Sequence, residues 1–140
     1  MPQPNKILVY SDGASRRNPG PAAIGFAIYD QNGNLLEQNA QYIGENTNNT
    51  AEYRALLWAM DRSCAHCRKN IRIHSDSELV VKQMTGVYRA KKDHLRDLLQ
   101  EALNKKALFE SFEIVHVPRN NSRLQAVDKL VNSALDQEGF

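Results

Sequence analysis

The sequence predicts an α/β fold: a mixed five-stranded sheet, antiparallel in its first three strands, flanked by helices. Short apolar runs fill the first third of the chain, and helical periodicity dominates the rest. Two further apolar runs lie between the expected helices. The 140 residues show no repeat, linker or low-complexity tract and are enough to bury a core, so we expect one domain over 1–140.

The first three strands are expected from apolar runs bounded by turn residues. "KILVYSD" at 6–12 predicts the first, and "AAIGFAIYD" at 22–30 and "LLEQNAQYIG" at 35–44 predict the next two. Residues 32–34, Asn-Gly-Asn, separate that pair and form a hairpin signal, because Gly and Asn accept positive φ. An antiparallel meander follows from this order.

The later elements alternate between helices and strands. A helix is expected to begin after Asn49 or Thr50, either of which can cap it, and to run to the Cys-x-x-Cys segment. The other expected elements are a strand at 70–76, helices at 77–86 and 92–106, a strand at 111–118 and a helix at 122–137.

Charge and apolar content limit the classes of protein. Lys and Arg outnumber Asp and Glu by 18 to 16, a small excess that neither requires nor excludes a polyanionic partner. No secretory signal is visible, and no apolar run approaches the ~18 residues that cross a membrane. We therefore expect a soluble cytoplasmic protein that has no membrane partner.

Both cysteines lie in one Cys-x-x-Cys, with His66 between Cys64 and Cys67. A structural zinc site needs four ligands, and no second Cys pair or spaced His pair follows. Zinc or redox chemistry stays open, but packing as small apolar residues is favoured.

Two acidic residues in the first half of the chain occupy unusual positions. Asp12 ends the first strand in phase with Leu8 and Tyr10, so its side chain should share their face; the alternative is an Asp that caps the next turn. Glu52 falls in the expected first helical turn, where the helix dipole alone could explain it. It is also in line with Leu56, so its carboxylate should point inward or along the sheet edge.

Two more acidic residues follow in the second half. Asp76 ends the strand at 70–76, where an ordinary helix N-cap is the alternative interpretation. Asp128 continues the spacing of Leu124, Val131 and Leu135, so an acidic residue takes a place in an apolar stripe. A buried carboxylate needs a cationic partner, either lysine or a divalent metal.

The expected sheet would bring these four carboxylates together. Oxygen-only ligation by Asp and Glu indicates Mg²⁺ or Mn²⁺ rather than zinc. Two such ions suit phosphoryl transfer, because one activates water and the other stabilises the leaving oxygen. The pattern therefore indicates phosphodiester hydrolysis.

Four segments, in order, resemble the type 1 ribonuclease H family, and the resemblance covers nearly the whole chain. They are "YSDGASRRNPGPAAIGF", "TNNTAEYRALLWAM", "IHSDSELVVKQ" and "HVPRNNSRLQAVDKLVNSAL". The resemblance implies a ribonuclease H-like sheet and a monomeric endoribonuclease that cuts the RNA strand of RNA/DNA hybrids, leaving 5′-phosphate and 3′-hydroxyl ends. It implies these metal ligands for two Mg²⁺ or Mn²⁺ ions: Asp12, Glu52, Asp76 and Asp128.

The same resemblance implies substrate contacts at Gly13, Asn18 and Asn48 in the minor groove. The roles are physically sensible, since glycine lets a sugar approach and the amides can bind base edges and 2′-hydroxyls. Arg16 and Arg17 are expected to contact phosphates, the alternative being solvated side chains.

The chain departs from the family pattern in several places and resembles its short subgroup. Glu78 stands where bacterial members often have Gln, which leaves that minor-groove contact open, and the basic Trp-rich insertion is missing. The loop before Asp128 lacks the mobile His and is about two residues longer than usual. Arg119 in this loop either replaces that His, positions a phosphate, or is solvated. We expect His116 and Trp58 to be packed in the fold.

Three functional hypotheses follow from these observations. The leading one is the metal-dependent nuclease, with double-stranded RNA as a possible second substrate. A catalytically weak module that binds hybrid or double-stranded RNA would gain nothing from clustered carboxylates. An acidic-pocket receiver domain would need a parallel sheet, which the expected meander contradicts.

Overall fold

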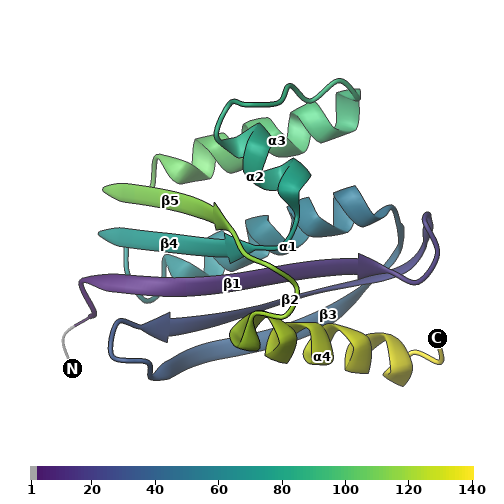
Figure 1. Ribbon diagram of the computed structural model, residues 1–140, viewed down its shortest axis with the longest axis horizontal. Coiled ribbons are helices and arrows are strands. Elements are labelled where there is room, and N and C mark those ends of the chain that lie inside the picture. The colour runs from purple at the N-terminus through teal and green to yellow at the C-terminus, as the bar shows by residue number, and fades with distance from the viewer. Residues whose placement is uncertain (1–2) are drawn as a thin grey trace.

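The computed structural model describes residues 3–140 as five strands and four helices around one mixed sheet (Figure 1). The elements are, in order, β1 (Lys6–Ser15), β2 (Gly20–Asp30), β3 (Leu35–Asn46), α1 (Asn48–Ser63), β4 (Asn70–Ser75), α2 (Glu78–Met84), α3 (Asp93–Lys106), β5 (Ser111–His116) and α4 (Ser122–Gln137). The predicted fold class is confirmed, and the 122–137 helix has the predicted bounds.

The sheet has the strand order β3-β2-β1-β4-β5. β1 pairs antiparallel with β2, and β2 pairs antiparallel with β3, so the predicted meander is confirmed. β4 and β5 add in parallel on the other side of β1. Because β1 and β4 run in the same direction, with Tyr10 opposite His74, their carboxyl ends meet at one edge.

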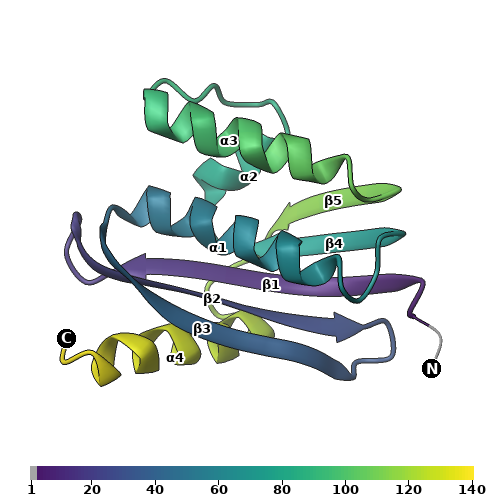
Figure 2. The same ribbon diagram turned by 180° about the vertical axis from the view of Figure 1, so that it is seen from behind.

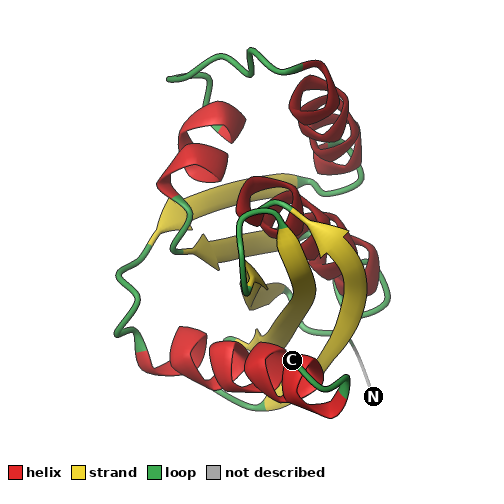
Figure 3. Ribbon diagram, turned by 90° about the vertical axis from the view of Figure 1, so that its right-hand side faces the viewer, coloured by secondary structure: helices red, strands yellow, loops and turns green. Residues whose placement is uncertain are grey.

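Helices cover both faces of the sheet. α1, α2 and α3 lie on one face and α4 on the other, as the two opposite views show (Figures 1 and 2). The end-on view places the sheet between α4 and the remaining helices (Figure 3). The larger core lies on the α1 side and includes Ile7, Val9 and Phe26, and a second core lies under α4.

The hairpin between β2 and β3 forms at the predicted Asn-Gly-Asn. Gly33 has a φ of +89°, and Asp30 Oδ1 accepts hydrogen bonds from the backbone N–H groups of Asn32 and Asn34. β1 and β3 run further than predicted because the two flanking pairings with β2 continue to Ser15 and Asn46. No helix in the described residues could span a membrane.

Candidate active site

Asp12 lies near the end of β1 and is only 6% exposed. It shares the α4 side of the strand with Leu8 and Tyr10, both of which pack in the core under α4, as predicted. The alternative of a turn-capping Asp is wrong, because β1 continues in register with β2 through Ser15.

Glu52 approaches Asp12 from α1. Gly13, the next residue of β1, donates its backbone N–H to Glu52 Oε1 at 2.6 Å. A Cβ on Gly13 would lie 2.3 Å from the carbonyl oxygen of Ala51, so only glycine lets α1 approach β1 this closely. This agrees with the prediction that the Glu52 carboxylate points inward or along the sheet edge.

The start of α1 differs from the prediction. The cap is Thr47, whose side chain accepts from the Thr50 N–H, rather than Asn49 or Thr50. The first helical turn therefore contains no acidic residue, and Glu52 belongs to the second turn. The helix dipole is a weak explanation for Glu52, because its effect falls off within the first turn.

Asp76 follows β4 directly and brings a third carboxylate to the same edge. The N-cap of α2 is Ser77, whose side chain accepts from the Val80 N–H, so the interpretation of Asp76 as the cap is wrong. Within residues 3–140, Asp76 Oδ1 is buried and has no hydrogen-bond partner. A buried oxygen of this kind calls for a cation or a proton.

Asp128 is exposed, which corrects the prediction that it is buried in the apolar stripe of α4. The buried stripe runs through Leu124, Val127, Val131 and Leu135, and Val127 occupies the place that the spacing allowed for Asp128. Asp128 lies one position further round the helix and lines the same cavity as Asp12. It requires no lysine partner in the core.

The three inner carboxylates converge. One oxygen each from Asp12, Glu52 and Asp76 lies within 4.8 Å of the others, while Asp128 stands at the rim of the cavity. The cavity has a volume of about 690 Å³ and is also lined by Gly13, Asn48, Glu78 and Arg119. The structure thus brings the four predicted carboxylates to one polar pocket, whereas Arg16, Arg17 and Asn18 are not among its lining residues.

The convergence changes how these groups titrate. Burial, followed by the negative charges of Asp76 and Asp128, raises the pKa of Asp12 to about 8. Burial and the negative charge of Asp12 raise the pKa of Glu52 well above its ordinary value. The site therefore attracts positive charge, in the form of protons or a metal.

The donor set fits a hard divalent cation. All of its donors are carboxylate oxygens, which suit Mg²⁺ or Mn²⁺, and Asp76 Oδ1 is without a partner in the described residues. Asp12, Glu52 and Asp76 would hold the ion, with Asp128 beside them. Such an ion, when bound, activates water and neutralises charge on a phosphodiester.

Arg119 stands at the mouth of the cavity. Its side chain is 94% exposed, and its Nε lies 3.5 Å from Asp76 Oδ2. Its positive charge opposes the rise in the pKa of Asp12. The guanidinium thus remains open to solvent while lying beside the carboxylates.

The loop between β1 and β2 is tied to α1 through two asparagines. Asn48 Oδ1 accepts from the Ser15 N–H at 2.8 Å, and the Asn48 N–H donates to Asn18 Oδ1 at 3.1 Å. Both side-chain carbonyls are thus used within the protein, and the NH₂ groups are the parts left to donate elsewhere. Arg17 is exposed on this loop.

Arg16 and Glu78 have protein partners. Arg16 turns toward α4 and pairs with Asp136 at 2.8 Å. Glu78 lines the cavity, is 61% exposed at its side chain and pairs with Lys82 at 2.6 Å.

The cavity also includes Asn49 and Gln125, which the sequence did not identify as site residues. Gln125 lies three residues before Asp128, and that helical spacing is the signal that could have found it.

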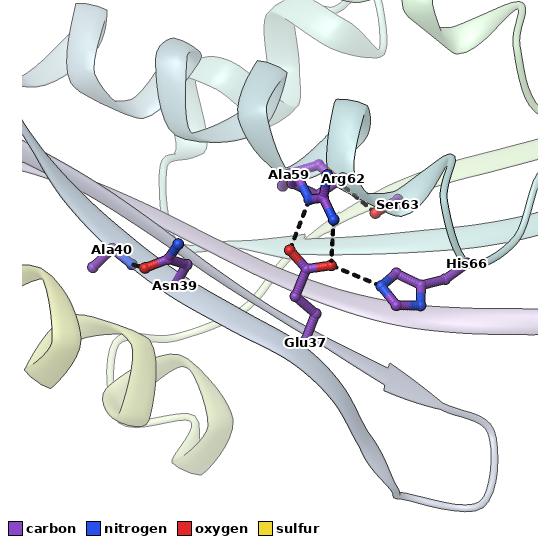
Figure 4. Close-up of polar contacts among 7 residues, drawn as sticks. All are labelled: Glu37, Asn39, Ala40, Ala59, Arg62, Ser63 and His66. Atoms are coloured by element: carbon purple, nitrogen blue, oxygen red, sulfur yellow. Dashed lines mark hydrogen bonds and ion pairs between the residues drawn. The ribbon is translucent and has the colours of Figure 1, made fainter.

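Both residues of the Cys-x-x-Cys segment pack in or against the larger core. Cys67 is buried in the core, and both thiols are free. His66 Nε2 donates to Glu37 Oε1 at 2.8 Å. Figure 4 shows His66 and Arg62 directed at the same Glu37 carboxylate, which joins β3 to the end of α1. The described residues contain no metal-binding group there.

Two further side chains were expected to be packed. Trp58 is half-buried and meets Phe26 edge-to-face at 4.8 Å between ring centroids, which confirms a packing role. His116 is exposed, so the prediction for it is wrong. It ends β5, an edge strand, and only Ser75 of β4 faces it in the sheet.

A mixed sheet with this strand order, helices on both faces and carboxylates gathered at the ends of β1 and β4 defines a ribonuclease H-like domain. The family model described as reverse transcriptase-like matches residues 10–134. Ribonuclease HI of Halobacterium salinarum is 37% identical over 131 residues, covering 94% of this chain and 65% of that protein.

Solved structures agree with this assignment. The crystal structure of RNase H1 from H. salinarum matches with a TM-score of 0.89 at 36% identity, covering 94% of this chain and 98% of that one. LC11-RNase H1 in complex with an RNA/DNA hybrid matches with a TM-score of 0.87 at 37% identity, with the same coverage. This chain belongs to the type 1 ribonuclease H family. It spans 65% of the length of the H. salinarum relative and 36% of three mycobacterial ones.

Proposed function

We propose that this chain is a metal-dependent endoribonuclease that hydrolyses the RNA strand of RNA/DNA hybrids, leaving 5′-phosphate and 3′-hydroxyl ends. The observation that carries the proposal is the convergence of Asp12, Glu52 and Asp76 within 4.8 Å, with Asp76 Oδ1 lacking a partner in the described residues. A neighbouring structure, LC11-RNase H1, holds an RNA/DNA hybrid and supports the substrate class.

The metal requirement in this proposal is two Mg²⁺ or Mn²⁺ ions. Asp12, Glu52, Asp76 and Asp128 supply only oxygen donors, and the raised pKa of Asp12 indicates strong demand for positive charge. The protein works as a monomer in this proposal, because all four carboxylates come from one chain.

The residues around the carboxylates have separate roles in binding. Asn18 and Asn48 use their side-chain oxygens internally, so their NH₂ groups would donate to base-edge acceptors and 2′-hydroxyls in the minor groove. Gly13 and Glu78 line the same cavity. Arg119, which lines this cavity, and Arg17, on the loop between β1 and β2, are exposed cations, and we assign them to phosphates.

The test is cleavage of an end-labelled hybrid in Mg²⁺ or Mn²⁺ by the wild-type chain and by Asp76→Asn. The matched control is Asp97→Asn, an exposed position on α3. We expect cleavage by the wild type and the control, and a loss of at least about 10²-fold in Asp76→Asn. A 5′-phosphate-dependent exonuclease and 3′ extension would identify the product ends.

Each outcome separates the proposal from its alternatives. Absence of cleavage by the wild type, or equal cleavage by Asp76→Asn, would overturn it. Hybrid retained on a filter but left intact would instead identify a binding module. A parallel reaction with double-stranded RNA shows whether the second strand must be DNA.

A further inference from the structure

The two terminal nitrogens of Arg16 contact α4 and the residue Phe140 that follows it. Nη2 pairs with Asp136 Oδ1 at 2.8 Å and donates to the carbonyl and side-chain oxygens of Asn132 at 3.1 and 3.2 Å. Nη1 donates to the carbonyl oxygen of Phe140. Both terminal nitrogens, which would form an end-on bidentate phosphate contact, therefore already have protein acceptors.

Arg17 makes a direct comparison possible. It is exposed, and within residues 3–140 its side chain has no hydrogen bond or ion pair. The two neighbouring arginines thus carry the same charge on the same loop, but only the guanidinium of Arg16 is fixed by protein acceptors. A phosphate that binds Nη2 of Arg16 would have to compete with the carboxylate of Asp136.

The contacts of Arg16 connect two elements of the site. Asn132, which accepts from Arg16, donates its own NH₂ to the carbonyl oxygen of Asp128 at 3.0 Å. On the other side, Arg16 donates its backbone N–H to the Pro21 carbonyl at 2.8 Å, which closes the loop that carries Asn18. Hydrogen bonds of Asn18 and Asn48 then attach this loop to α1.

We infer that Arg16 is a positioning residue, which fixes the loop carrying Asn18 between α1 and α4 and does not itself contact the substrate. The inference rests on the proposed function for its effect on hybrid binding. Its structural part, loop ordering through the Arg16–Asp136 pair, can be measured without nucleic acid.

The first experiment compares hydrogen exchange at the backbone amides of Ser15, Arg16 and Asn48 in the wild type, Arg16→Ala and Arg17→Ala. All three amides donate within the loop network, so Arg16→Ala should expose them and speed their exchange about tenfold. Arg17→Ala should leave them unchanged. Unchanged exchange in Arg16→Ala overturns the inference, whatever the nuclease assays give.

The second experiment measures hybrid affinity across KCl concentrations, with Asp76→Asn as a common background so that the hybrid stays intact. Arg17→Ala should flatten the plot of log affinity against log salt by about 0.9, the value of one lost phosphate contact. Arg16→Ala should weaken binding about tenfold at each salt concentration with the slope unchanged, the equivalent of one charge-assisted hydrogen bond.

Two further variants separate position from charge. Arg16→Lys keeps the charge but cannot form the forked contacts, so it should behave like Arg16→Ala. Asp136→Asn, at a side chain that is 67% exposed, should fold normally and weaken binding in the same way.

If Arg16→Ala flattens the slope, if Arg16→Lys binds like the wild type, or if Asp136→Asn binds more tightly, Arg16 is a phosphate contact and the inference is wrong. If the wild type ignores hybrid while exchange still rises in Arg16→Ala, the proposed function fails and the positioning role stands.

Discussion

Replacement of Asp12 by asparagine is expected to stabilise the metal-free protein while abolishing its activity. The pKa of Asp12 is raised to about 8 in the folded chain, first by burial and then by Asp76 and Asp128, whereas the ordinary value is 3.8. Between these pH values the unfolded chain has lost a proton that the folded chain keeps. Stability therefore falls as pH rises from about 4 to about 8 and is level above that range. Asparagine carries no such proton.

The size of the gain follows from the same shift. Between pH 3.8 and the folded pKa, the free energy of unfolding falls by about 1.4 kcal/mol for each pH unit. At pH 7 the loss from this one group is therefore at most about 4 kcal/mol. An ionised pair at 4.8 Å, the spacing limit of the cluster, gives about 3.5 kcal/mol at an effective dielectric of 20. The pKa of Glu52 is raised as well, so Glu52 and Asp12 compete for the same proton. We therefore expect Asp12→Asn to raise the free energy of unfolding by about 2–4 kcal/mol, or Tm by roughly 5–15 °C.

The assay is thermal unfolding followed by circular dichroism in EDTA, from pH 4 to pH 9. Asp12→Asn is compared with the wild type and with Asp97→Asn, which removes an exposed carboxylate on α3. The gain should be near zero at pH 4, grow toward pH 8, and shrink in saturating Mg²⁺, because the cation stabilises only the wild-type cluster strongly. Asp97→Asn should change Tm little at any pH.

Two results would refute this account of the cluster. A Tm for Asp12→Asn at or below that of the wild type at pH 8 in EDTA would show that the carboxylates do not destabilise the fold. A gain of the same size at pH 4 and pH 8 would show that it comes from packing and not from charge.

Three other changes test contacts around the site. Gly13→Ala should lower the unfolding free energy by about 3 kcal/mol in urea titrations, because the new Cβ lies 2.3 Å from a backbone oxygen of α1; a neutral result contradicts the close packing. Tyr53→Phe should cost about 1–2 kcal/mol by leaving the buried Gln83 Oε1 without its donor, and unchanged stability would exclude that bond. Glu37→Gln should cost about 1 kcal/mol at pH 7, since Arg62 lowers the pKa of Glu37. That contribution is present above the ordinary value of 4.5 and is lost as pH falls through the lower folded value, so a cost that does not decline as the pH falls below 4.5 would contradict the ion pair.

The sequence was sufficient to predict the sheet edge where the carboxylates meet. Period-two alternation placed Asp12 on the face of Leu8 and Tyr10, and the structure confirms it. Strand and helix order then implied the mixed sheet that brings Asp76 beside Asp12. These features depend on local pattern and chain order, which a single sequence contains.

The side-chain environments that the sequence could not decide depend on distant contacts. At 100° per residue, Val127 and Asp128 of α4 lie on opposite sides of the direction of Leu124 and close to it. Either could therefore face the core, and the packing of α4 on the sheet buries Val127. Arg16 could have bound phosphate or protein, and its partner Asp136 lies 120 residues further along the chain. No local pattern distinguishes these outcomes.

The parallel pairing of β1 and β4 explains why the site forms where it does. The register matches Tyr10 with His74, so the same step along both strands brings Asp12 level with Asp76. Buried carboxylates that lie this close together raise one another's pKa. Asp12 and Glu52 both show this rise. Glu52 accepts the Gly13 N–H, but Asp76 Oδ1 has no donor in the described residues, so hydrogen bonds neutralise the cluster only in part. The fold therefore holds its own negative charges together at a cost in stability, and binding a cation is the step that recovers it.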